Sequence, residues 1–281
     1  MKENYVFHIL TEYLNLLAPE VDVKISEKSA VPIKAVSGDA KFAKIKKISE
    51  QLQRENKYLF FSWGQSRNYT KDEIQNAKLF HLIPRARVAP EGDRCGTVYD
   101  ETYACPHCGA GACIDGDLYL SLTRLPKTSD IAMSISGEII VSQRLVDVFT
   151  SAGISDAIFK PLHRKKRKDT DFCGWYEWQM SSSEVDIAPQ TLVGDKIFGL
   201  KADDEKYVCP LGDTIGLNLL SELSVFAASY CGKDVGQTRQ YIGRRSGVIH
   251  PQRQILVSPR VRNIFVSHGL KGADFEVVHL V

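Results

Sequence analysis

The chain has 281 residues, of which 43% are hydrophobic and 25% charged, and its formal net charge at pH 7 is +2. This is the composition of a globular protein of about two domains. No run approaches the roughly 18 apolar residues of a membrane span, and Glu3 and Glu12 interrupt the apolar stretch that a signal peptide needs. Seven cysteines, four of them clustered, argue against a disulfide framework. We therefore expect a cytoplasmic protein without a membrane partner.

The first ninety residues have the pattern of a small α+β unit. Apolar residues at helical spacing predict that the chain opens with an amphipathic helix over 6–17. The capping-box sequence from Thr70 to Glu73 predicts the start of a short helix. Three further elements are predicted here: a helix over 40–54, a strand over 58–63 and a strand over 79–88. The N-terminal unit is thus predicted to span 1–90.

Four cysteines within nineteen residues predict a metal site: Cys95, Cys105, Cys108 and Cys113. The turn Cys105-Pro-His-Cys108, followed by glycine, is typical of a zinc knuckle, which points two thiolates at one tetrahedral Zn²⁺. A redox pair is the competing interpretation. Cys95 and Cys113 are the expected remaining ligands; the alternatives for the fourth position are His81, His107 or a site that has lost its metal. A closed site with four protein ligands is structural.

An internal repeat is the second informative feature. Residues 139–163 align without gaps on 255–279, and ten of the twenty-five positions are identical. Each copy predicts a strand, a helix capped by Ser142 or Ser258 and ended by Gly153 or Gly269, and a second strand. Two copies are too few for a solenoid, so we expect a duplicated strand–helix–strand module inside a larger fold.

The rest of the chain completes a second, larger α+β body predicted at 91–281, which carries the zinc knuckle and both modules. Strands are predicted over 174–180 and 196–200, and a buried helix over 217–228. The predicted fold class of the whole chain is therefore α+β.

Basic residues are concentrated in two segments. One is the run 163–168; the other is 235–273, which contains no acidic residue. The candidate partner-binding residues of the second segment are Arg239, Arg244, Arg245 and Arg253. Such segments suit an anionic partner, either a phosphate backbone or an acidic protein surface. The alternative is that the arginines pair with acids elsewhere in the fold.

No catalytic motif is present. The sequence lacks a nucleophile elbow, a phosphate-binding glycine loop, a His-Glu-x-x-His helix and a dinucleotide-binding fingerprint. A zinc deaminase would need an upstream His-x-Glu and a proline before the cysteine pair, not inside it. We therefore expect a non-catalytic protein, although an enzyme site assembled from distant residues would leave no such motif.

The knuckle and the duplicated module together resemble the bacterial immunity proteins of polymorphic-toxin systems, in particular the double-CXXCG-motif family. The resemblance covers about 94–281 and implies a protein that binds and neutralises a cognate toxin. It places knuckle ligands on Cys105 and Cys108, whereas the place of a second knuckle is held by Cys209-Pro-Leu-Gly-Asp, without its second cysteine. The alternative function is a nucleic-acid-binding zinc-knuckle protein that uses 164–168 and 239–262.

Overall fold

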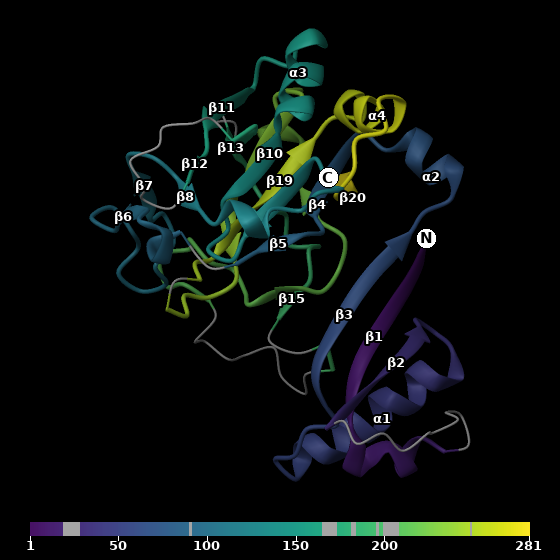
Figure 1. Cartoon of the computed structure of the whole chain (residues 1–281). Coiled ribbons are helices and arrows are strands. Elements are labelled where there is room, and N and C mark those ends of the chain that lie inside the picture. Colours follow the sequence, from purple (N-terminus) through teal and green to yellow (C-terminus); the bar gives the residue numbers. More distant parts are fainter. Residues whose placement is uncertain are drawn as a thin grey trace. The chain divides into compact units, whose positions relative to one another are not determined.

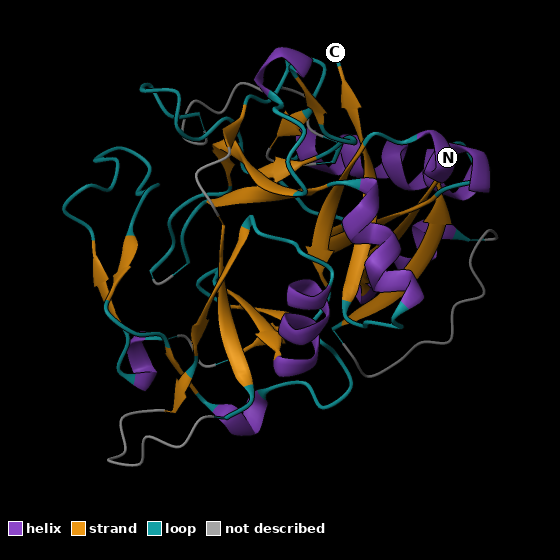
Figure 2. Cartoon of the chain, turned by 90° about the horizontal axis from the view of Figure 1, so that it is seen from above, coloured by secondary structure: helices purple, strands orange, loops and turns teal. Residues whose placement is uncertain are grey.

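The computed structural model describes residues 1–18, 29–89, 92–164, 173–180, 184–194, 197–198, 208–247 and 249–281. They form two compact units: Met1–Asn76 with Lys196–Ala202, and Ala77–Asp195 with Asp203–Val281. Helices and strands occur in both, so the fold class is α+β, as predicted (Figures 1 and 2). The division comes before β4, and not after residue 90, because β4 lies inside a sheet of the larger unit. No described helix is long and apolar enough to cross a membrane.

The described residues of the N-terminal unit form a three-stranded antiparallel sheet of order β2-β1-β3 with two α-helices and one 3-10 helix. Its elements are β1 (Lys2–Leu10), a 3-10 helix (Thr11–Leu17), β2 (Ala30–Val36), α1 (Ala40–Arg54), β3 (Phe60–Asn68) and α2 (Lys71–Asn76). The helix predicted over 40–54 is confirmed by α1. The capping box is also confirmed, since the Thr70 backbone N–H donates to Glu73 at 2.7 Å and the Glu73 N–H donates to the Thr70 hydroxyl at 3.2 Å.

The predicted opening helix over 6–17 is wrong. Residues 2–10 form β1, which pairs with strands on both sides, and only the following 3-10 helix is helical. Tyr5, Phe7 and Ile9 alternate along β1 and are all buried. The apolar residues of this segment satisfy both a period of two and helical spacing, and pairing on both edges of the strand favours the extended form.

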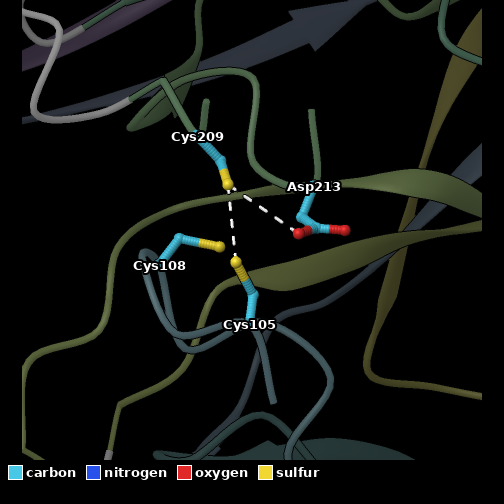
Figure 3. A group of neighbouring side chains, drawn as sticks. All are labelled: Cys105, Cys108, Cys209 and Asp213. Carbon is cyan, nitrogen blue, oxygen red and sulfur yellow. Dashed lines mark hydrogen bonds between the residues drawn. The ribbon is translucent and has the colours of Figure 1, made fainter. Parts of the chain in front are cut away.

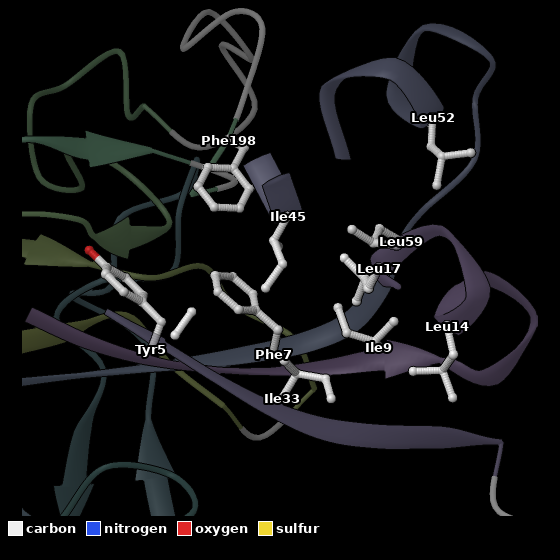
Figure 4. Close-up of a cluster of buried hydrophobic side chains, with 11 residues drawn as sticks. Tyr5, Phe7, Ile9, Leu14, Leu17, Ile33, Ile45, Leu52, Leu59 and Phe198 are labelled. Atoms are coloured by element: carbon white, nitrogen blue, oxygen red, sulfur yellow. The ribbon is translucent and has the colours of Figure 1, made fainter. Parts of the chain in front are cut away.

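The core of the N-terminal unit is shown in Figure 4. Phe7 lies at its centre, fully buried, under α1. A residue from much later in the chain completes this core: the ring centroid of Phe198 lies 5.6 Å from that of Phe7 and 5.3 Å from that of Phe42 on α1. The N-terminal unit is therefore not built from one continuous segment. The strand predicted over 196–200 lies mostly outside the described residues, and 197–198 are in a turn.

The larger unit contains two main sheets. The five-stranded sheet has the order β11-β13-β10-β9-β5, and the six-stranded sheet has the order β14-β18-β19-β4-β20-β17. The first sheet and its helix comprise β5 (Arg87–Val88), β9 (Ile131–Ser134), β10 (Ile139–Ser142), α3 (Gln143–Ser151), β11 (Ala157–Pro161) and β13 (Trp175–Met180). The second comprises β4 (Leu79–Pro84), β14 (Glu184–Val185), β17 (Ser224–Val225), β18 (Val235–Ile242), β19 (Gln252–Val257), α4 (Pro259–Ser267) and β20 (Ala273–Leu280).

Short strand pairs and 3-10 turns connect these sheets. The pairs are β6 (Val98–Asp100) with β7 (Cys113–Asp115), β8 (Tyr119–Leu120) with β12 (His163–Arg164), and β15 (Val193–Gly194) with β16 (Asn218–Leu219). The 3-10 turns are Asp93–Cys95, Leu122–Arg124 and Ala227–Ser229. The helix predicted over 217–228 is wrong, because this segment is extended: Ser224 lies opposite His279 in a parallel pairing.

The duplicated module is confirmed. In the first copy the Ser142 hydroxyl caps α3 by accepting from the Leu145 N–H at 3.2 Å; in the second the Ser258 hydroxyl caps α4 through Val261 at 3.3 Å. Each helix ends before a glycine of positive φ, Gly153 at +68° and Gly269 at +60°. Only glycine adopts this backbone conformation without steric cost, so both copies stop at the same position.

The two modules are completed by strands from outside themselves. In the first module β10 and β11 are not adjacent, because β13 lies between them; in the second, β4 lies between β19 and β20. The registers match: Glu177 of β13 lies opposite Ile140, and His81 of β4 lies opposite Leu256, the residue equivalent to Ile140. The strand that fills the first module follows it in sequence, whereas the strand that fills the second precedes both modules.

The helices of the two modules also meet. Phe149 of α3 and Phe265 of α4 occupy equivalent positions in the repeat, and their rings pack edge to face with centroids 6.0 Å apart. Each ring also contacts the equivalent phenylalanine of its own second strand, Phe159 or Phe275. Equivalent residues that touch each other indicate an approximate twofold relationship between the copies.

Candidate metal centre

Four side chains of the larger unit converge on one point: Cys105, Cys108, Cys209 and Asp213. Each offers one ligand atom, and all four atoms lie within 4.8 Å of one another. Figure 3 shows the three sulfurs and the carboxylate directed toward a common centre. Cys209 is buried, and Cys105, Cys108 and Asp213 are half-buried. We call these residues the four-donor group.

The first pair of donors is held by the predicted knuckle. The Cys105 backbone N–H donates to the Ala110 carbonyl at 2.7 Å, and the Gly109 N–H donates back to the Cys105 carbonyl at 2.8 Å. Gly109 has φ +71°, which permits the tight reversal after Cys108. The knuckle is therefore a closed backbone loop that fixes the positions of both thiols.

The second pair of donors comes from a related loop 104 residues later, at 209–214. The Cys209 N–H donates to the Thr214 carbonyl at 2.7 Å, the same five-residue span that closes the first loop. The Leu211 N–H lies 3.4 Å from the Cys209 sulfur, a contact that stabilises a thiolate. Asp213 is held in turn, because its carbonyl accepts from the Tyr241 N–H of β18 at 2.7 Å. The two loops face each other, and each precedes one of the duplicated modules in the sequence.

Two separations within the four-donor group are close to those around a tetrahedral ion. The Cys105 and Cys209 sulfurs lie 3.5 Å apart, and the Cys209 sulfur lies 3.7 Å from an Asp213 carboxylate oxygen. Around a tetrahedral Zn²⁺ with metal–sulfur bonds of about 2.3 Å, two sulfurs lie about 3.8 Å apart, and a sulfur and a carboxylate oxygen about 3.5 Å. A disulfide would need a sulfur–sulfur distance of about 2.05 Å. At 3.5 Å the Cys105 and Cys209 sulfurs are not joined as a disulfide.

The two thiols that lie 3.5 Å apart differ in acidity. Burial raises the pKa of the Cys105 thiol to about 12, and the hydrogen bond with Asp213 acts in the same direction. The pKa of Cys209 is lowered: burial opposes ionisation, but the N–H groups of Leu211 and Asp213 outweigh it. A divalent cation displaces the thiol protons when it binds, so metal affinity at this group would depend on pH.

The four-donor group contains two of the predicted ligands and leaves out the other two. Cys105 and Cys108 belong to the four-donor group, but Cys95 and Cys113 do not. Cys95 is buried at the end of a 3-10 turn, and Cys113 is exposed on β7. The alternative ligands His81 and His107 also lie outside the group. The first knuckle supplies only two donors. The other two members of the group, Cys209 and Asp213, come from the loop at 209–214.

Of the two donors that the sequence did not predict, Cys209 carried a signal and Asp213 did not. Cys209-Pro-Leu-Gly-Asp starts as a knuckle does, and its aspartate, not a second cysteine, supplies the other donor. Three thiolates and one carboxylate are a donor set that suits Zn²⁺, and four protein donors leave no open position for a substrate. The described residues thus provide a group of four donors that could hold a metal ion in a closed site.

The candidate partner-binding arginines are mostly paired within the chain. Arg245 makes a two-pronged contact with Glu101, at 2.6 and 2.5 Å. Arg239 lies 3.3 Å from Asp186, and Arg253 pairs with Glu184. Arg244 is exposed. Most of the basic run at 163–168 lies outside the described residues. Pairing with distant acids, the alternative interpretation of the sequence, therefore holds for Arg239, Arg245 and Arg253.

Comparison with protein-family models and with curated proteins finds no match to this chain. The site must therefore be interpreted from its own geometry.

Proposed function

We propose that this chain is a non-catalytic cytoplasmic binding protein of the immunity type, which neutralises a cognate bacterial toxin and whose body is held together by one structural Zn²⁺. The observation that carries the proposal is the four-donor group. It takes two donors from each of two related loops, so a metal there would join segments that are far apart in the sequence. A closed four-ligand ion contributes to folding and offers no position at which a substrate is activated.

The duplicated scaffold supports a binding role. The residues identical in the two modules serve as caps, helix stops and core, as Ser142, Gly153 and Phe149 illustrate. Such residues stabilise the fold of each module. The exposed side chains that differ between the copies are then the ones available to bind a partner. The paired loops of the metal centre fit the resemblance to the double-CXXCG-motif immunity proteins, with Asp213 in place of a second cysteine.

The arginine contacts disfavour nucleic-acid binding as the main function. A guanidinium group that already contacts a carboxylate, as in Arg245 with Glu101 or Arg253 with Glu184, has to break that pair before it binds a phosphate. Phosphate-dominated affinity would also fall steeply with added salt, so the two functions give different salt responses.

The test is recovery of the tagged chain from its native cytoplasm, with metal analysis of the same sample. We expect one stoichiometric protein partner that is toxic when expressed alone and harmless when co-expressed with this chain, together with about one zinc per chain. The variant Cys209→Ser should lose both zinc and protection, whereas Cys231→Ser, an exposed cysteine outside the four-donor group, should keep both. Recovery of RNA or DNA that is released by salt, with no protective effect, would overturn the proposal.

A further inference from the structure

The four-donor group contains two thiols that lie close enough to react with each other. The Cys105 and Cys209 sulfurs are 3.5 Å apart and are both free (Figure 3). A disulfide needs about 2.05 Å between its sulfurs, so a movement of about 1.5 Å would bring these two to bonding distance. The pair is therefore placed for a cross-link between segments that are 104 residues apart in the sequence.

The surroundings of Cys209 favour the reactive form of its sulfur. The Leu211 N–H lies 3.4 Å from that sulfur, and an N–H directed at a sulfur stabilises negative charge on it. The thiolate, not the thiol, is the form that attacks an oxidant. Cys209 is itself buried, but Cys105 beside it is half-buried, so the pair is not closed off from a solute as small as a peroxide.

We propose that hydrogen peroxide joins Cys105 to Cys209 in a disulfide, and that this bond replaces the metal ion as the link between the two loops. The release of metal rests on the proposed structural Zn²⁺, whereas the disulfide depends only on the two thiols. Oxidation takes away two of the four donors and leaves Cys108 and Asp213. Two donors do not hold an ion that prefers four.

The reaction has two steps. The Cys209 thiolate attacks one oxygen of the peroxide: a sulfur–oxygen bond forms, the oxygen–oxygen bond breaks, and the second oxygen leaves as water with the proton that Cys209 gave up. The Cys105 sulfur then attacks the sulfenic acid on Cys209. The disulfide forms, the sulfur–oxygen bond breaks, and the oxygen leaves with the Cys105 proton as a second water. The two thiols together lose two electrons, which the peroxide gains.

A disulfide within the knuckle, between Cys105 and Cys108, is the competing product. It would leave the loop at 209–214 without a bond to the knuckle once the metal is gone. The bond between Cys105 and Cys209 instead keeps both loops together, and a cross-link between residues so far apart in the sequence restricts the unfolded chain strongly. The oxidised chain should therefore melt at a higher temperature than the reduced chain from which a chelator has removed the metal.

The test treats the full-length chain, as isolated, with a small excess of hydrogen peroxide, blocks the remaining thiols and digests the product with trypsin. Trypsin leaves Cys105 in the peptide 95–124 and Cys209 in the peptide 207–233. We expect these peptides to be linked, and fragmentation of the linked pair to place the bond between Cys105 and Cys209. Zinc released into a coloured chelator should reach about one ion per disulfide, and a dithiol with added zinc should reverse both changes.

Two matched controls complete the test. Cys113→Ser and Cys231→Ser each remove an exposed cysteine from one of the same two peptides and leave the four-donor group intact, so both variants should still form the cross-link. A bond between Cys105 and Cys108, or oxidation confined to the exposed cysteines, would overturn the inference. A cross-link that forms in a chain isolated without zinc supports it and overturns the proposed zinc centre alone, so the two failures are distinguishable.

Discussion

The guanidinium group of Arg144, in the first turn of α3, donates a hydrogen bond to the backbone carbonyl of His268, the residue that caps the end of α4. The reverse contact also exists: Arg260 of α4 donates to the carbonyl of Ala152, which caps the end of α3. Both pairs are related by the repeat. Each module therefore satisfies a carbonyl that the other module's helix leaves without an intrahelical partner.

Each of these arginines also forms an ion pair with an aspartate. Arg144 pairs with Asp130 at 3.1 Å, and Arg260 pairs with Asp234 at 2.6 Å. The same aspartates accept from the serine hydroxyls that cap the two helices. Two equivalent clusters thus connect the start of one helix to the end of the other across the two modules.

We predict that Arg144→Ala and Arg260→Ala each lower the free energy of unfolding by about 1 kcal/mol, since each removes hydrogen bonds at a half-exposed position. Chemical denaturation measures this. Arg124→Ala, at an exposed position of the same unit, should have little effect. Equal losses of unfolding free energy in all three variants would show that the hydrogen bonds between the modules do not stabilise the unit.

The metal centre gives a prediction that distinguishes the four-donor group from the ligand set that the cysteine spacing suggested. Cys209→Ser should reduce bound zinc from about one ion per chain to nearly none, because a tetrahedral site cannot keep its affinity with three donors. Cys113→Ser should leave the zinc content unchanged, although Cys113 is far closer to the knuckle in sequence. Metal analysis by mass spectrometry decides this, and the opposite pattern would show the four-donor group to be wrong.

Asp213 is the least expected ligand and has its own test. Asp213→Ala should lower zinc affinity by at least about tenfold, as the loss of even an outer partner of a metal ligand does. Asp213→Cys supplies a fourth thiolate and should bring the affinity back to that of the native chain or above it. Competition with a chelator measures both. Unchanged affinity in Asp213→Ala would remove the carboxylate from the ligand set.

Glu177 predicts a dependence of stability on pH. Burial raises its pKa in the folded state, so its protonated form is favoured there. The associated stability is fully present below the ordinary pKa of glutamate and is lost as the pH rises through the higher folded value. We expect Glu177→Gln to raise the melting temperature at pH 8, where the native carboxylate is charged, and to change it little at pH 4. A melting temperature raised equally at both values would contradict this.

Local features of the fold were predictable from the sequence. The caps at Ser142 and Ser258, the capping box from Thr70 and the helix over 40–54 depend on residues within one or two turns of each other, and all are present. The prediction failed in β1 and at 217–228, where apolar residues fit more than one period and the choice depends on strands far away in the chain.

Half of the metal centre was predictable for the same reason. Cys105 and Cys108 share one turn, so their spacing alone indicates a metal. Asp213 has no spacing signature, because an aspartate after a glycine is common in turns. Only the fold brings it to Cys105. The insertion of β4 and β13 into the modules has no local signal either, since each strand pairs with partners that the sequence does not place beside it.

The position of β4 determines when the larger unit can form during synthesis. β4 ends at Pro84, and both of its neighbours, β19 and β20, lie beyond residue 251. On the ribosome this apolar strand must wait for almost the entire remaining chain before its two edges are covered. Pairings this distant in sequence form slowly and leave strand edges open to other chains. We therefore expect β20 to pair with β4 late in folding, and removal of β20 to expose one edge of β4.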